Sequence, residues 1–287
     1  MFNGVALNIF ITFLSCLACG FGNFCFGKDL TPDSIPRWHQ LKKGLSYFEI
    51  NASQRSILGD SRIFILKADP LQCRFKILSA SENRGHDRPA DVWAKDYNLN
   101  VVVNAGMFNM VNHRTSKGYL KISTHFNNGR LNGNYNVMMA MDPIKETDSS
   151  MVIADMTCLD WNVLRLKYRT LCQGMRMIDG TGNPMVWDKR PGQMCSMVVG
   201  ATDLNGNIYF VFSRSPFTHQ QMIGFLFQLI PQIRTTVYLE GGPEASLYIQ
   251  TADTVISKYG SYVSKTYAND KNDHFWKIPN VIGILAH

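Results

Sequence analysis

Charge is missing from the start of the sequence: residues 1–27 contain no Asp, Glu, Lys, Arg or His. Residues 5–22 form an almost unbroken apolar run, and the first charged side chain is Lys28. Such a stretch, with small residues just before Lys28, is typical of a secretory signal peptide. Because roughly 18 apolar residues can just span a bilayer, an uncleaved N-terminal anchor is the alternative. Both interpretations predict an exported protein, secreted or periplasmic, which contacts a membrane only if this segment is retained.

Linkers between domains are also missing. No Pro/Ser/Gly-rich linker, low-complexity tract or internal repeat interrupts the chain after residue 27. About 260 residues are enough for one substantial hydrophobic core. We therefore predict one domain over residues 61–287, preceded by an N-terminal extension at 28–60.

Blocks of basic residues are absent too. Lys and Arg outnumber Asp and Glu by 29 to 22, which gives a net charge of +7, but the basic residues are scattered and not interleaved with aromatic side chains. This distribution argues against a nucleic-acid partner and agrees with an anionic substrate or surface.

Beyond residue 27 the sequence has no zinc signature. No Cys-x-x-Cys pair occurs there, and the histidines at 86, 113 and 125 share no ligand spacing. No cofactor is required, and calcium or magnesium, held by carboxylates and backbone carbonyls, stays open. The cysteines beyond residue 27 are Cys73, Cys158, Cys172 and Cys195. An even number in an exported protein permits disulfides, with Cys158 and Cys172 closest in sequence, and buried free thiols are the equal alternative.

Short β-branched and aromatic runs, separated by turn residues, predict many strands. The expected strands are 62–67, 75–78, 101–103, 151–154, 175–178, 197–201 and 207–212. Pro89 opens a short helix, and Asn205-Gly206 predicts a hairpin turn. The pattern predicts an α+β domain in which a few helices pack on a central mixed, largely antiparallel sheet.

One strand–helix–strand unit stands out after residue 207. A helix from Thr218 to about Ile230, opened by a capping box, separates the strand 207–212 from the strand 235–239. A crossover of about 20 residues normally joins parallel strands. Because such strands end at the same edge of the sheet, we expect Arg214 and Glu240 to lie near each other. His219 in the first helical turn is expected to be solvated, and Glu244 to lie on an exposed strand edge.

Asn104-Ala-Gly-Met-Phe108 resembles the Asn-x-Gly-x-Phe signature of the phosphodiester glycosidase family. Later segments follow in the family's order: Lys117-Gly-Tyr-Leu120, Gln173-Gly174, Asp179-Gly180, Ser196-Met-Val-Val-Gly200, Leu239-Glu-Gly-Gly-Pro243 and Ile278-Pro-Asn-Val-Ile-Gly-Ile284. The similarity covers roughly residues 60 to 285. It implies hydrolysis of a sugar that is linked through its anomeric carbon to a phosphodiester. Glu240 stands where the family usually has Asp, and Cys195-Ser196 where many members have Arg.

The chemistry of that reaction needs a carboxylate and a cation. A phosphate leaving group has a second pKa near 6 and departs with little help from an acid. Glu240 is the predicted nucleophile or general base, because a carboxylate can stabilise an oxocarbenium-like centre or activate water. Arg214, Arg190 and Arg176 are the candidates for the phosphate, whose oxygens suit the guanidinium fork.

Other predicted site residues surround this core. Asn104 can bond a sugar hydroxyl or the phosphate, and is counted with Glu240 and Arg214 as catalytic. Bare backbone at Gly241 and Gly242 lets amide groups approach an anion. The resemblance adds Gly106 and Ser196 to the predicted substrate-binding residues.

Two other functions stay open at this point. The chain could bind phosphorylated or anionic glycans without turnover, or it could be a phosphodiesterase that attacks phosphorus. The leading hypothesis is an exported hydrolase whose partner is a glycosyl phosphodiester of envelope or extracellular glycans.

Overall fold

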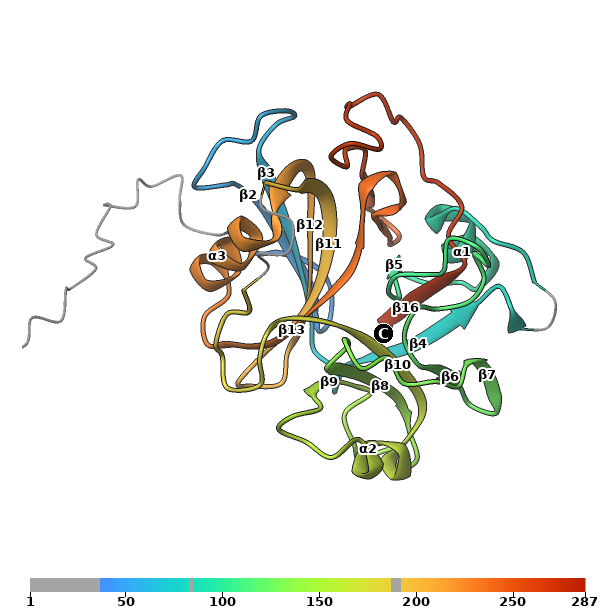
Figure 1. Ribbon diagram of the computed structural model, residues 1–287. Coiled ribbons are helices and arrows are strands. Elements are labelled where there is room, and N and C mark those ends of the chain that lie inside the picture. Colours follow the sequence, from blue (N-terminus) through green and yellow to red (C-terminus); the bar gives the residue numbers. More distant parts are fainter. Residues whose placement is uncertain (1–36, 83–84, 187–191, 287) are drawn as a thin grey trace, which may run out of the picture. The chain divides into compact units, whose positions relative to one another are not determined.

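The longest strands of the chain build one large sheet (Figure 1). The computed structural model describes residues 37–82, 85–186 and 192–286, so the predicted signal peptide or anchor at 1–27 lies outside the described residues. Eleven described strands form this sheet, and each recorded pair is antiparallel. In spatial order they are β1 (His39–Lys42), β2 (Leu45–Asn51), β3 (Arg62–Ala68), β12 (Ile208–Thr218), β11 (Met194–Asp203), β13 (Ile233–Gly241), β10 (Tyr168–Ile178), β6 (Leu120–Ile122) and β7 (His125–Asn128), with β8 (Val137–Pro143) paired to β10 and β9 (Met151–Asp155) paired to β8.

A second sheet of five described strands is also antiparallel. Its order is β15 (Val255–Tyr259), β14 (Ser246–Gln250), β5 (Val101–Asn104), β16 (Asn280–Ala286) and β4 (Cys73–Ser79). The helices of the described chain are α1 (Ala90–Asp96), α2 (Trp161–Lys167) and α3 (His219–Leu229), and a 3₁₀ turn spans Gly242–Glu244. The predicted α+β class is confirmed.

The main core lies between the two sheets. Alternate side chains of a strand share one face, and on the facing sides of these sheets they are apolar and buried. Phe210, Val237 and Leu239 of the large sheet belong to the same cluster as Val103 and Ile282 of the small one. Helix α3 covers the other face of the large sheet, and α1 the other face of the small one.

The crossover predicted after residue 207 is present (Figure 1). Strands β12 and β13 run parallel, because both are antiparallel to β11, which lies between them. Helix α3 begins at the predicted capping box: the Thr218 hydroxyl accepts from the backbone of Gln221, whose side chain accepts from the backbone N–H of Thr218.

The predicted end of the strand at residue 212 is wrong. Strand β12 continues to Thr218 and so contains Arg214 and Pro216. A bulge explains why proline is tolerated, since the ladder passes from the pair Met197–Ser213 to the pair Cys195–Phe217 and leaves residue 216 outside it.

The large sheet also begins earlier than predicted. Residues 45–51 of the expected N-terminal extension form β2, which pairs with β3 along its whole length. Phe48 and Leu45 are buried in the process. Residues 37–60 are therefore part of the same packed unit as the rest of the described chain.

The described cysteines are all free thiols. Cys73, Cys172 and Cys195 are buried and Cys158 is exposed, so no disulfide joins Cys158 to Cys172. The Cys172 thiol instead donates to the backbone oxygen of Ala105 at 2.9 Å. No helix in the described parts of the chain is long and apolar enough to cross a bilayer.

Candidate active site

Glu240 lies at the end of a central strand. Val198 of β11 pairs with Glu240 and Val199 pairs with Tyr238, so Leu239 forms a bulge in β13. Bulges of this kind redirect a side chain and are frequent beside active sites. The Glu240 carboxylate is half-buried and accepts from the backbone N–H of Gly241 at 3.1 Å.

The electrostatics of Glu240 are unusual. Burial raises the pKa of its carboxyl to about 8, and the negative charge of Glu244 acts in the same direction. The N–H of Gly241 and the charge of Lys117 oppose this rise. A pKa of about 8 favours the protonated form of Glu240 at neutral pH.

Glu244 supplies a second half-buried carboxyl group beside the first. It ends the 3₁₀ turn and does not lie on an exposed strand edge, so that prediction is wrong. Burial raises its pKa, while its own backbone N–H and the charge of His113 lower it. Two interacting carboxyl groups at one site titrate as a pair, and the pair retains a proton longer than either group would alone.

Two glycines, Gly241 and Gly242, separate these carboxyl groups in the sequence. Gly242 has φ +71°, and a β-carbon there would lie 3.4 Å from Glu244 Oε2. A β-carbon on Gly241 would collide with the Tyr238 hydroxyl and lie 3.0 Å from Cys195 Sγ. Glycine at 241 therefore leaves space for Tyr238 and Cys195. The approach of these backbone amides to an anion stays a prediction.

Asn104 connects the end of β5 to this turn. The residue is 1% exposed. Its Nδ2 donates to the backbone oxygen of Glu244 at 3.0 Å, and its Oδ1 accepts from the backbone N–H of Ser246 at 2.7 Å. Both polar atoms are thus used to hold the backbone on either side of Ala245. This geometry makes Asn104 a positioning residue for Glu244 rather than a ligand of substrate.

The loop after β5 brings cations to the acids. It starts at Gly106, whose φ of +126° suits glycine and where an added β-carbon would lie 4.0 Å from Cys172 Sγ. Exposed His113 and Lys117 follow, and their charges act on Glu244 and Glu240. Tyr135 is buried close by, and burial together with the charge of Glu240 raises its pKa to about 12.

The predicted arginines do not join this group. Arg214 is bound by Asp270 at 2.7 Å and donates to the backbone oxygens of Tyr259 and Asn272. Arg176 forms a buried ion pair with Asp155 at 2.7 Å. These contacts hold Arg214 to the segment that follows β15 and hold Nη1 of Arg176 to Asp155, whereas Nε of Arg176 has no hydrogen-bond partner. Arg190 lies outside the described residues.

Ser196 is a structural residue. It is fully buried. Its hydroxyl donates to the backbone oxygen of Arg214 and accepts from the backbone N–H groups of Ser261 and Tyr262. These bonds use its hydroxyl, and a substrate-binding role for Ser196 stays a prediction.

Sequence reasoning missed Lys117, His113 and Tyr135 as members of the site. Glu244 was a possible second carboxylate from the sequence, but an exposed strand edge was preferred for it. The spacing Glu240-x-x-x-Glu244 across two glycines was the one available signal. The prediction that His219 is solvated was wrong: the residue is half-buried, its ring packs against Tyr238 in a tilted arrangement with 4.9 Å between ring centroids, and burial lowers its pKa to about 4.

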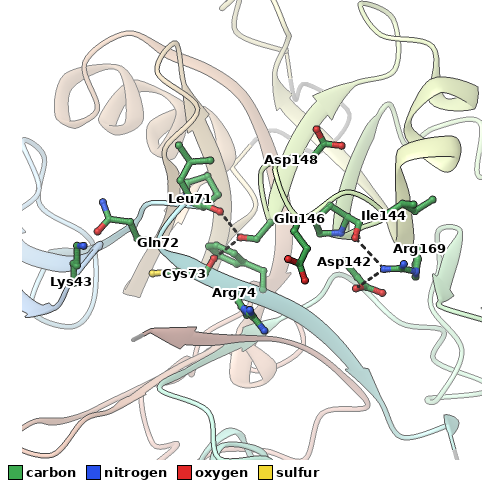
Figure 2. A pocket seen from close by; sticks show the side chains of 14 residues that line it. Lys43, Leu71, Gln72, Cys73, Arg74, Asp142, Ile144, Glu146, Asp148 and Arg169 are labelled. Carbon is green, nitrogen blue, oxygen red and sulfur yellow. Dashed lines mark hydrogen bonds and ion pairs between the residues drawn. The ribbon is translucent and has the colours of Figure 1, made fainter.

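A cavity lies away from these acids (Figure 2). It has a volume of about 640 Å³ between the start of β4 and the loop after β8. Its charged lining residues are Lys43, Arg74, Arg169, Asp142, Glu146 and Asp148. Their charges balance, and Arg169 is already paired with Asp142 at 3.5 Å. This cavity therefore indicates no ligand class.

Metal ligands do not gather in the described residues. No group of three or more His, Cys, Asp or Glu side chains there is arranged to hold an ion. Calcium or magnesium binding stays a prediction.

Comparison with known proteins finds similar structures but no similar sequences. No family model and no curated protein matches the sequence. Among solved structures, the catalytic domain of zebrafish N-acetylglucosamine-1-phosphodiester α-N-acetylglucosaminidase, auto-inhibited by its pro-peptide, aligns with a TM-score of 0.57 and 14% identity, over 87% of this chain and 86% of that one. The likeness is one of fold. A hypothetical protein from Synechocystis aligns with a TM-score of 0.53 and 14% identity, over 85% of this chain and 62% of its own.

The zebrafish alignment bears on the resemblance seen in the sequence. The motifs predicted a domain like those of phosphodiester glycosidases, and the chain shares the fold of one such catalytic domain. An identity of 14% leaves membership of the family, the reaction and the substrate as proposals.

Proposed function

We propose that this protein is an exported hydrolase that cleaves glycosyl phosphodiesters at the bond to the anomeric carbon. The observation that carries the proposal is the pair of half-buried carboxyl groups, Glu240 and Glu244, both with raised pKa. Paired acids with perturbed pKa values are typical of glycoside hydrolysis. The fold shared with a phosphodiester glycosidase catalytic domain supports it further. Export rests on the uncharged segment 1–27.

In this proposal the two acids have different roles. Protonated Glu240 approaches an anionic phosphodiester without repulsion and donates a hydrogen bond to it. Ionised Glu244, which the charge of His113 favours, activates water or stabilises the oxocarbenium-like centre. Because the phosphate ester leaves as a stable anion, the proton on Glu240 serves mainly to bind and neutralise it.

Cations at the rim suit the phosphate. Lys117 and His113 are exposed and act electrostatically on the two acids. They take the part that the sequence assigned to Arg214, Arg190 and Arg176. In this proposal the water proton passes to Glu244, the water oxygen bonds to the anomeric carbon, and the bond from that carbon to the phosphate oxygen breaks.

The test uses the methyl phosphodiester of α-N-acetylglucosamine 1-phosphate, with the glucose and mannose analogues, in water labelled with heavy oxygen. Cleavage at the anomeric carbon places the label in the sugar, whereas attack on phosphorus places it in methyl phosphate. Label in phosphate favours the phosphodiesterase alternative, and binding without turnover favours a non-catalytic glycan-binding protein.

Substitution of the acids tests the site itself. We expect Glu244→Gln, which removes the base, to lower kcat by about 100-fold or more. Glu240→Leu, which removes the hydrogen-bond donor, should lower kcat/KM by roughly 10- to 100-fold. Glu146→Gln, on an exposed loop, is the matched control and should keep full activity. Near-normal turnover by either site variant would remove that residue from the mechanism.

A further inference from the structure

Asn280 is a buried amide without partners. Its side chain belongs to a residue that is 3% exposed, and neither Oδ1 nor Nδ2 has a hydrogen-bond partner. Within the described residues, it is the one buried side chain with two unpartnered polar atoms. Buried amides are nearly always bonded, because losing water without a replacement is unfavourable. An unpartnered buried amide therefore needs an explanation.

The strand register places Asn280 on the inner face of the small sheet. It pairs with Ser79 at the start of β16, and the side chains two and four positions further on, Ile282 and Ile284, lie in the core between the sheets. Alternate side chains of a strand share a face. Asn280 therefore stands at the polar end of that core, where the apolar residues stop.

The same end of the sheet carries the candidate active site. Val281 pairs with Asn104, the residue that holds Glu244 in place. The backbone oxygen of Asn280 accepts from the Ala105 N–H at 3.1 Å, and the backbone oxygen of Ala105 in turn accepts from the Cys172 thiol. Cys172 and Glu240 both act on the pKa of Tyr135, which lies near both.

We propose that Asn280 binds the sugar ring of the substrate. A carboxamide offers two N–H donors and an acceptor oxygen, which matches a sugar hydroxyl that both donates and accepts. Glu240 and the rim cations contact the phosphate, whereas Asn280 contacts the glycosyl unit and so contributes to the choice of sugar. This assignment rests on the proposed function.

The experiment compares the same substitution at two buried asparagines. Asn272 is 4% exposed and fully bonded: Nδ2 donates to the oxygens of Gly260 and His274, and Oδ1 accepts from Trp276. Asn272→Leu should lower the thermal midpoint, because it leaves those groups unpaired. Asn280→Leu removes an unpartnered amide at similar volume and should keep or raise the midpoint.

Activity is the second measurement. With the methyl phosphodiester of α-N-acetylglucosamine 1-phosphate, we expect Asn280→Leu to lower kcat/KM by roughly 10- to 100-fold, the range for losing one or two hydrogen bonds. If the leucine variant does not fold, Asn280→Ala provides the same comparison. A stable variant with unchanged kcat/KM, or a variant as destabilised as Asn272→Leu, overturns the assignment while leaving the proposed function standing. A wild-type protein that neither binds nor cleaves the probe overturns the proposed function, and the assignment with it.

Discussion

Glu240 shows how one side chain acquires a property from its place in the sheet. In water a glutamate is ionised at neutral pH. At the end of β13, burial and the second acid reverse this, and the pKa of Glu240 rises to about 8. The N–H of Gly241 and the charge of Lys117 reduce the effect without removing it.

This pKa shift predicts a change of stability with pH. The folded protein holds the Glu240 proton up to about pH 8, whereas the unfolded chain releases it near the ordinary value of 4.5. The folded state therefore binds more protons in this window, and the contribution of Glu240 to stability is lost as pH rises from 4.5 to 8. We expect Glu240→Gln to lose less stability than the wild type over this window, measured by urea unfolding at pH 5 and pH 8.5. Parallel pH dependence of the two proteins would contradict the burial of this charge.

At the scale of elements, β11 and the segment after β15 are joined through Ser196. Its hydroxyl accepts from the N–H groups of Ser261 at 2.9 Å and Tyr262 at 3.0 Å. The bulge between Cys195 and Met197 sets Ser196 opposite residues 214–216 of β12. One small side chain thus replaces several ladder hydrogen bonds where the strands separate.

Ser196→Ala should therefore lower stability without changing the chemistry. Two buried N–H groups lose their acceptor, which costs about 1–3 kcal/mol, measured by urea unfolding. KM for the sugar phosphodiester should stay unchanged, and Ser53→Ala, at an exposed position, is the matched control. A raised KM with unchanged stability would restore the substrate-binding role that the sequence indicated.

At the scale of the whole described unit, Arg214 connects the two sheets. It belongs to β12 of the large sheet, and its side chain donates to the backbone oxygen of Tyr259 at 3.0 Å. Tyr259 is the last residue of β15 in the small sheet. Its ion pair with Asp270 and its bond to Asn272 extend this connection to the following loop. The guanidinium also packs over the Tyr259 ring.

We expect Arg214→Met to loosen this connection. Stability should fall by about 1–3 kcal/mol, and proteolysis within residues 259–272 should become faster, while kcat/KM changes little. Arg169→Met is the control, since its exposed pair with Asp142 should contribute under about 1 kcal/mol. An unchanged stability with a raised KM would instead make Arg214 a phosphate ligand, as the sequence suggested.

The prediction from sequence succeeded where local rules decide the structure. Short-range patterns located β3, β4, β5, β9 and α1 to within a few residues. The capping box at Thr218 was also recognised. Strands β6, β7 and β8 were missed, because their sequences are short or rich in Met and Asn, and their pairing with distant strands decides their conformation.

The sequence by itself determined that a carboxylate and two glycines follow a buried strand, because strand propensity and glycine's freedom are local properties. Only the tertiary structure decided what surrounds them. Asn104 reaches Glu244 across 140 positions of the chain, and Arg214 is taken by Asp270 rather than by a ligand. The physical reason is that strand register and burial, which set these neighbours and the pKa of Glu240, depend on packing between segments far apart in the sequence.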